Sequence, residues 1–128
     1  MSIFVLKPFD RNLKRYSISE EKLFSAAREI MAGQYEADLG GGVFKKRIAL
    51  DAGKSGGARS VIIFKYGGNL FFVNGWSKSD IKKHGGKEIA ADDLAAYRIL
   101  AKQLLAMSRT EVDKALAAGI MRELKCDD

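Results

Sequence analysis

The sequence predicts a single α+β domain spanning residues 1–128, in which an antiparallel sheet is flanked by an N-terminal helix and by C-terminal helices. The chain has 128 residues, of which 47% are hydrophobic. This is enough for one domain with a core and too little for two. Short turns join most of the expected strands, which disfavours a doubly wound parallel sheet. Segments with helical periodicity lie before and after those strands.

The N-terminal part predicts a strand and a helix. Residues 3–7, Ile-Phe-Val-Leu-Lys, form an apolar run that Pro8 ends, since proline cannot donate to a strand ladder. A helix is expected over residues 20–32, where Ser17 and Glu20 have the spacing of a capping box. Its apolar residues fall on one helical face: Leu23, Phe24, Ala27, Ile30 and Met31.

The middle of the chain predicts four extended segments: residues 35–39, 43–50, 59–66 and 70–74. The first pair is joined by the glycine run at residues 40–42, which can act as a hinge. The second pair flanks Gly67-Gly68-Asn69, a sequence typical of a tight hairpin because these residues adopt positive φ easily. Residues 59–74 are therefore expected to form a hairpin.

The C-terminal part predicts two helices after a polar stretch at residues 77–87. One helix is expected over residues 91–107 and a shorter one over residues 110–118, where Ser108 and Glu111 have capping-box spacing. The longer helix carries an apolar stripe made of Leu94, Tyr97, Ala101, Leu104 and Leu105.

The positive charge of the chain is concentrated in its middle third. The net charge is +6, but residues 43–87 contain ten Lys and Arg against two Asp, which gives this segment +8 and leaves the remainder at −2. Such a concentration favours a polyanion partner, most often nucleic acid, because phosphate neutralisation releases counterions. The alternative is a solvated basic surface that serves solubility.

Several other kinds of site are disfavoured. Gly53-Lys54-Ser55 lacks the glycine that a phosphate loop needs five positions earlier, where Ile48 stands. The chain has one His and one Cys, His84 and Cys126, in different regions, so neither a metal site nor another cofactor is expected.

The sequence also predicts a cytoplasmic protein without a membrane segment. A single cysteine cannot form an intramolecular disulfide, which favours a reducing compartment. The longest apolar run, residues 61–64, is far shorter than the ~18 residues of a membrane span, and no signal-peptide core is present.

Basic residues near the strands predict a phosphate-binding surface. Alternate strand residues share a face, so Lys45 and Arg47 can point one way while Lys46 points the other. The glycines at 53–57 allow a phosphate to approach the backbone closely, and Arg59 can reach it with a bidentate guanidinium. Trp76 beside this region is either a core residue or a base-stacking residue.

Three ordered sequence blocks resemble a known protein family: Leu39-Gly-Gly-Gly-Val-Phe-Lys-Lys-Arg-Ile-Ala49, Gly53-Lys-Ser-Gly-Gly-Ala-Arg59 and Phe71-Phe-Val-Asn-Gly-Trp-Ser-Lys78. Over residues 3–120 the chain is similar to small RelE-like toxins of the RelE/ParE superfamily, close to the HigB-type branch. The resemblance implies a microbial-RNase-like fold whose curved antiparallel sheet has a basic concave face. It also implies ribosome-dependent cleavage of messenger RNA, hence an mRNA interferase, and neutralisation by a cognate antitoxin that commonly has a helix-turn-helix region.

The resemblance and the charge pattern together suggest roles for individual residues in a metal-independent endoribonuclease. Arg59 is expected to stabilise the transition-state phosphate, and His84 is the candidate for proton transfer because it titrates near neutral pH. The complete catalytic set is Lys45, Arg47, Arg59, Lys78 and His84. The expected RNA- or phosphate-binding set is Lys46, Lys54, Ser55, Gly56, Trp76, Lys82 and Lys83.

Two other functions remain open from the sequence alone. A ParE-like relative would inhibit DNA gyrase through protein contacts and would need no nuclease chemistry. A non-catalytic module that binds RNA or protein through its basic surface is the second alternative.

Overall fold

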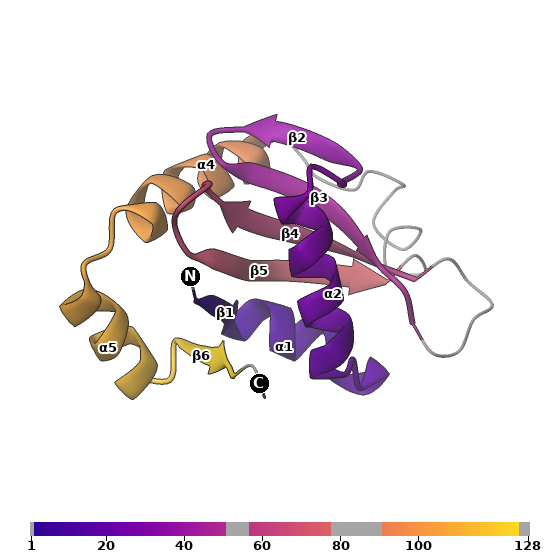
Figure 1. The fold of residues 1–128 in the computed structure, drawn as a ribbon, viewed down its shortest axis with the longest axis horizontal. Coiled ribbons are helices and arrows are strands. Elements are labelled where there is room, and N and C mark those ends of the chain that lie inside the picture. Colours follow the sequence, from indigo (N-terminus) through magenta and orange to yellow (C-terminus); the bar gives the residue numbers. More distant parts are fainter. Residues whose placement is uncertain (1, 51–56, 78–90, 126–128) are drawn as a thin grey trace.

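The computed structural model describes residues 2–50, 57–77 and 91–125, which form a six-stranded sheet with helices on both faces (Figure 1). The elements in chain order are β1 (Ile3–Leu6), α1 (Lys7–Leu13), the 3-10 helix η1 (Lys14–Tyr16), α2 (Glu20–Met31), β2 (Ala37–Gly40), β3 (Val43–Ile48), β4 (Ala58–Phe64), β5 (Leu70–Ser77), α4 (Ala91–Leu105), α5 (Arg109–Ala117) and β6 (Met121–Leu124).

The sheet confirms the α+β class. Its strand order is β2-β3-β4-β5-β1-β6, and every neighbouring pair is antiparallel except β1 and β5. The hairpin formed by β4 and β5 is present, with Gly67 at φ +82° in its turn. β1 lies between β5 and β6, and its residues Phe4, Val5 and Leu6 are buried, as expected for an apolar strand inside a sheet.

Three elements were not predicted from the sequence: α1, the short 3-10 helix η1 and β6. Pro8 does follow the end of β1, but it also lies in the first turn of α1, where a missing N–H costs nothing. The two turns of α1 bury Phe9 and Leu13, which are four residues apart. β6 has the sequence Met-Arg-Glu-Leu and forms by antiparallel pairing with β1.

The predicted helix at the N-terminal side is confirmed as α2, but its predicted cap is wrong. Ser19, rather than Ser17, is the N-cap, and its side chain accepts a hydrogen bond from the backbone N–H of Lys22. Ser17 instead ends η1 with a positive φ of 48°. The first turn of α2 therefore begins two residues later than the Ser17–Glu20 spacing indicates.

The two faces of the sheet carry separate apolar cores. Against one face lie α1 and α2, with Phe9, Leu13, Leu23 and Ile30 packed on strand residues such as Phe72. The other face packs against α4 and α5 through the side chains Ala101, Val112, Ala115, Val61, Phe71 and Val73. Figure 1 shows α2 crossing in front of the sheet and α4 behind it. No helix in the described parts of the chain is long and apolar enough to cross a membrane.

The predicted capping box of the last helix is present and makes its stability pH-dependent. Ser108 N–H donates to the Glu111 carboxylate at 3.0 Å, and Glu111 N–H donates to the Ser108 hydroxyl at 3.2 Å. The hydrogen bond from the Ser108 backbone lowers the pKa of Glu111 below its ordinary value of 4.5. A carboxylate with a lowered folded-state pKa stabilises the fold above its unfolded-state pKa, and this contribution is lost as pH falls through the folded-state pKa.

We therefore expect Glu111→Ala to lower the melting temperature at neutral pH, and we expect the difference from the wild type to shrink as pH falls below 4.5. Thermal unfolding followed by circular dichroism across this pH range measures the effect. A difference that stays constant down to about pH 3 would show that the ionised carboxylate is not what stabilises the helix end.

Candidate nucleic-acid interface

The register of β3, β4 and β5 brings basic side chains into two adjacent rows on one face of the sheet. Arg47 pairs with Arg59, and Arg59 pairs with Trp76 on the next strand. In the second row, Lys45 pairs with Val61, which pairs with Asn74. Val61 packs in the core beneath α4. Because side chains two residues apart on a strand share a face, Lys45, Arg47 and Arg59 all lie on the α4 side.

This group, Lys45, Arg47 and Arg59, is hereafter the basic cluster. It lies toward the end of the sheet that α4 leaves uncovered. In Figure 1 the C-terminal ends of β3 and β5 and the N-terminal end of β4 meet at one end of the sheet, and α4 lies over the other end. Arg47 is exposed, whereas Lys45 and Arg59 are partly buried and have polar or electrostatic partners within the protein. The prediction that Lys45 and Arg47 share a face is confirmed.

The basic cluster places two like charges directly opposite each other. Arg47 and Arg59 are cross-strand partners, and neighbours in such pairs have Cβ atoms about 5 Å apart. Like charges at this spacing destabilise a sheet. Each guanidinium also offers a fork of N–H donors that matches phosphate oxygens. Arg59 has a partner within the protein, and the Glu36 carboxylate accepts from the Arg47 backbone N–H at 2.9 Å, so the two cations do not stand alone.

Lys46 lies on the opposite face, away from the basic cluster. Its side chain is 7% exposed, and its Nζ lies 3.5 Å from the Glu29 carboxylate of α2. Its backbone carbonyl accepts a hydrogen bond from the buried Ser60 hydroxyl at 2.7 Å. Lys46 is therefore separated from the basic cluster, because the strand alternation turns its side chain toward α2, and its binding of RNA phosphate stays a prediction.

Trp76 is partly a core residue, and base stacking by its exposed part stays a prediction. Its ring packs at the edge of the core beneath α4, yet the side chain stays partly exposed in the same row as Arg59. The indole N–H is buried and has no acceptor among the described residues. An unpaired buried donor is costly, by about 1–3 kcal/mol.

A polar pair next to the basic cluster was missed from the sequence. Tyr97, assigned above to an apolar stripe of α4, accepts a hydrogen bond from the Asn74 side chain at 2.9 Å. The Asn74 carbonyl oxygen accepts from Asn12 of α1 at 2.7 Å and from the Gly75 N–H at 2.8 Å. Burial raises the pKa of the Tyr97 hydroxyl above its ordinary value of 10.0, so the phenol keeps its proton at neutral pH.

The shift of strand register explains why Asn74 was missed. Val61 pairs with Asn74 but Ile62 pairs with Phe72, so Val73 is an extra residue in β5. Such a bulge changes which residues of a strand share a face. The sequence offered one signal for the pair of Asn74 and Tyr97. It was an asparagine late in an apolar strand, followed by a helix with one tyrosine in its apolar stripe.

The other predicted site residues lie outside the described residues: Lys54, Ser55, Gly56, Lys78, Lys82, Lys83 and His84. Of the predicted phosphate-approach glycines, only Gly57 is described. Its φ is +75°, and a Cβ added there would lie 2.5 Å from the Ile48 carbonyl oxygen. The close contact with Ile48 of β3 is therefore enough by itself to explain why residue 57 is a glycine.

Comparison with known proteins gives one family match. A family model described as the RelE toxin of the RelE / RelB toxin-antitoxin system matches residues 1–124. Searches among curated proteins and among solved structures found no match. The family match spans all the described strands and helices, including the basic cluster.

Proposed function

Since this chain belongs to the RelE family of toxins from toxin–antitoxin systems, we propose that its toxic action is ribosome-dependent cleavage of messenger RNA. The observation that supports the proposal most directly is the cross-strand pair of Arg47 and Arg59, with Lys45 in the adjacent row. A site for gyrase inhibition needs no such concentration of like charge on one sheet face. A ribonuclease does, because its transition state carries additional negative charge.

The proposed reaction is attack of a ribose 2′-oxygen on the adjacent phosphorus. The P–O5′ bond breaks, which gives a cyclic 2′,3′-phosphate and a 5′-hydroxyl. The phosphorane-like transition state needs cationic donors, and we assign this role to Arg59 with support from Arg47. Lys45 is assigned to the RNA backbone or to the 2′-hydroxyl, whose proton has to leave.

Protonation of the departing 5′-oxygen needs a separate group. His84 keeps the role suggested by the sequence, since its ordinary pKa lies near neutral. Tyr97 is a second proposed donor. Its oxygen accepts from Asn74, which leaves its O–H proton for donation to a substrate oxygen.

The experiment that tests this function compares a translated transcript with an untranslated copy of the same RNA after brief induction of the toxin. Primer extension should reveal cuts in the translated copy alone. Growth arrest with DNA breaks and intact transcripts would instead indicate gyrase inhibition. Ribosome association without cuts or arrest would indicate a non-catalytic binding module.

A further inference from the structure

The hydrogen bond between Asn74 and Tyr97 can run in only one direction. Asn74 Oδ1 accepts from the Gly75 backbone N–H at 2.8 Å and from the Asn12 side chain at 2.7 Å. A backbone N–H can only donate, so it fixes which end of the Asn74 amide is the carbonyl. The amide Nδ2 therefore faces Tyr97 and donates to its hydroxyl oxygen at 2.9 Å. The backbone of β5 thus sets the direction of the bond.

The proton of the Tyr97 hydroxyl is consequently not used inside the described part of the protein. A phenol has one O–H donor, and here its oxygen is the acceptor of the Asn74 bond. Tyr97 makes no further hydrogen bond to the described residues. Because the side chain is only partly buried, its O–H can point away from Asn74 toward a bound substrate.

Asn74 lies next to the basic cluster. It belongs to the cross-strand row of Lys45 and Val61, and the neighbouring row contains Arg59 and Trp76. Rows two residues apart on a strand are separated by about 7 Å. The Asn74 side chain reaches Tyr97 of α4, the helix that packs on the same sheet face as Val61. The Tyr97 hydroxyl is therefore on the face of the basic cluster.

The donor from α1 reaches Asn74 because β1 ends early. The register of β1 on β5 ends at Phe72, so β1 does not pair with β5 beyond that residue. α1 follows β1 directly and packs so closely that a Cβ at Gly75 would lie 2.5 Å from Leu13 Cδ1. Asn12, the residue before Leu13, is thereby placed against Asn74. A helix from one face of the sheet thus bonds to a side chain that serves the other face.

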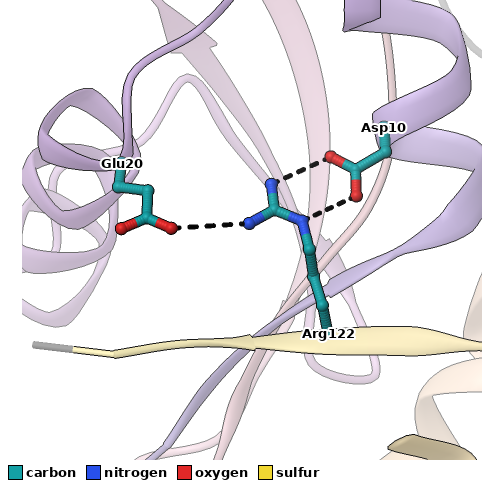
Figure 2. A network of polar contacts seen from close by, with 3 residues as sticks. All are labelled: Asp10, Glu20 and Arg122. Atoms are coloured by element: carbon teal, nitrogen blue, oxygen red, sulfur yellow. Dashed lines mark hydrogen bonds and ion pairs between the residues drawn. The ribbon is translucent and has the colours of Figure 1, made fainter. Parts of the chain in front are cut away.

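An ion-pair network holds α1 in the position that this contact requires (Figure 2). Arg122 of β6 donates two hydrogen bonds to the Asp10 carboxylate of α1, at 2.8 and 3.0 Å. Its third guanidinium nitrogen lies 3.7 Å from the Glu20 carboxylate at the start of α2. A helix of seven residues is too short to be stable alone, so its position depends on such contacts. Asn12 lies two residues after Asp10 and is held with it.

We propose that Asn74, held by Asn12, is a positioning residue that directs the Tyr97 proton to the departing 5′-oxygen of the RNA. The inference rests on the proposed nuclease function and adds to it the residue that orients the proton donor. As the P–O5′ bond breaks, its electron pair passes to O5′, which takes the proton from the Tyr97 hydroxyl. The phenolate that remains keeps the hydrogen bond from Asn74 and regains a proton from water.

Asn74 also stabilises the charge that forms on Tyr97. Burial raises the pKa of the Tyr97 hydroxyl, the Asn74 bond lowers it, and the nearby Asp93 carboxylate raises it. A donor aimed at the phenol oxygen favours the ionised form and so helps the group to release its proton. Asn12 strengthens this effect, because a donor on Asn74 Oδ1 polarises the amide and makes its N–H a better donor.

Asn74→Asp tests the direction of the bond with almost no change of shape. A carboxylate cannot donate, so the Tyr97 hydroxyl has to donate to it and its proton turns away from the RNA. We expect the single-turnover cleavage rate at saturating ribosomes to fall by about 100-fold, as for Tyr97→Phe. The ribosome concentration that gives half the maximal rate should stay unchanged, because the loss is in the chemical step.

The matched control is Asn69→Asp, which makes the same substitution at another partly buried asparagine next to the same hairpin turn. The Asn69 side chain accepts a hydrogen bond from the Ser2 N–H at 3.1 Å, and a carboxylate can accept it equally well. Cleavage by this variant should stay within about twofold of the wild type. An equal loss in the two Asp variants would contradict the proposal, since added negative charge would then explain it.

An RNA with sulfur in place of the 5′-bridging oxygen separates proton donation from other roles. A thiol is a far stronger acid than an alcohol, so a thiolate leaves without being protonated. On this RNA, Asn74→Asp and Tyr97→Phe should cleave within about threefold of the wild type. Equal losses on the oxygen and sulfur substrates would show a merely structural role and would overturn the proposal. Loss of this kind in His84→Gln alone would assign the proton to His84 instead.

Asn12→Ala is the second variant, because Asn12 is exposed and its removal leaves the core intact. It should slow cleavage of the oxygen substrate by about three- to tenfold, the effect of one hydrogen bond, and leave the sulfur substrate unaffected. In a Tyr97→Phe background it should cost less than about twofold, because the group that it helps to position is gone. Independent, multiplied losses would contradict the proposal. Absence of cleavage by the wild type would refute the nuclease function itself, whereas wild-type rates in both asparagine variants would refute only the role of Asn74.

Discussion

Arg59→Gln is expected to slow ribosome-dependent cleavage of messenger RNA by about 100- to 1000-fold, the effect typical of removing one transition-state donor. Glutamine keeps a polar side chain of moderate length but removes the charge and the bidentate fork. The loss should appear in the single-turnover rate at saturating ribosomes, since a group that acts in the transition state changes the rate of the chemical step. Arg59→Lys should recover only part of the rate, because a point charge replaces the fork.

Lys46→Met is the matched control for this prediction. Lys46 is a cation on the strand next to Arg59, but it lies on the opposite face beneath α2. Its replacement should leave cleavage within about twofold of the wild type, because no phosphate contact is lost. Circular dichroism establishes that both variants fold. Equal rate losses in the two variants would show that overall charge, rather than the placement of Arg59, supports activity.

The contrast between Lys46 and its neighbours shows what the sequence could predict about the site. Alternation along a strand follows from backbone geometry alone, so the shared face of Lys45 and Arg47 was predictable. Which face each residue takes depends on the helices that cover the sheet. The burial of Lys46 depends on Glu29, a contact between elements that the sequence pattern does not encode.

The missed elements have a similar cause. α1 has seven residues, too few for a clear helical period, and it is stabilised by packing of Phe9 and Leu13 on the sheet. β6 exists because β1 offers an unpaired edge. The pocket lined by α1, the start of α2 and β6 forms where these two missed elements meet α2, so it could not be predicted from the sequence.

Gly57→Ala is expected to lower the free energy of unfolding by about 3 kcal/mol. Two costs combine at this position. Gly57 has φ +75°, a conformation that costs a residue with a side chain about 1–2 kcal/mol. The new Cβ would also lie 2.5 Å from the Ile48 carbonyl oxygen, which is backbone and cannot turn away as a side chain can. The chain has to shift at the junction of β3 and β4.

Gly67→Ala separates these two costs. Gly67 has φ +82°, but a Cβ there meets no atom within 4 Å. This variant should therefore lose only the conformational part, about 1 kcal/mol. Thermal unfolding should place Gly57→Ala roughly 10 °C below the wild type and Gly67→Ala much closer to it. Because Gly57 lies two residues before Arg59, the same shift should also reduce cleavage. Equal melting temperatures for the two variants would show that the end of β3 can shift to accommodate a new side chain at little cost. The close packing of Ile48 on Gly57 would then not be needed to hold Arg59 opposite Arg47.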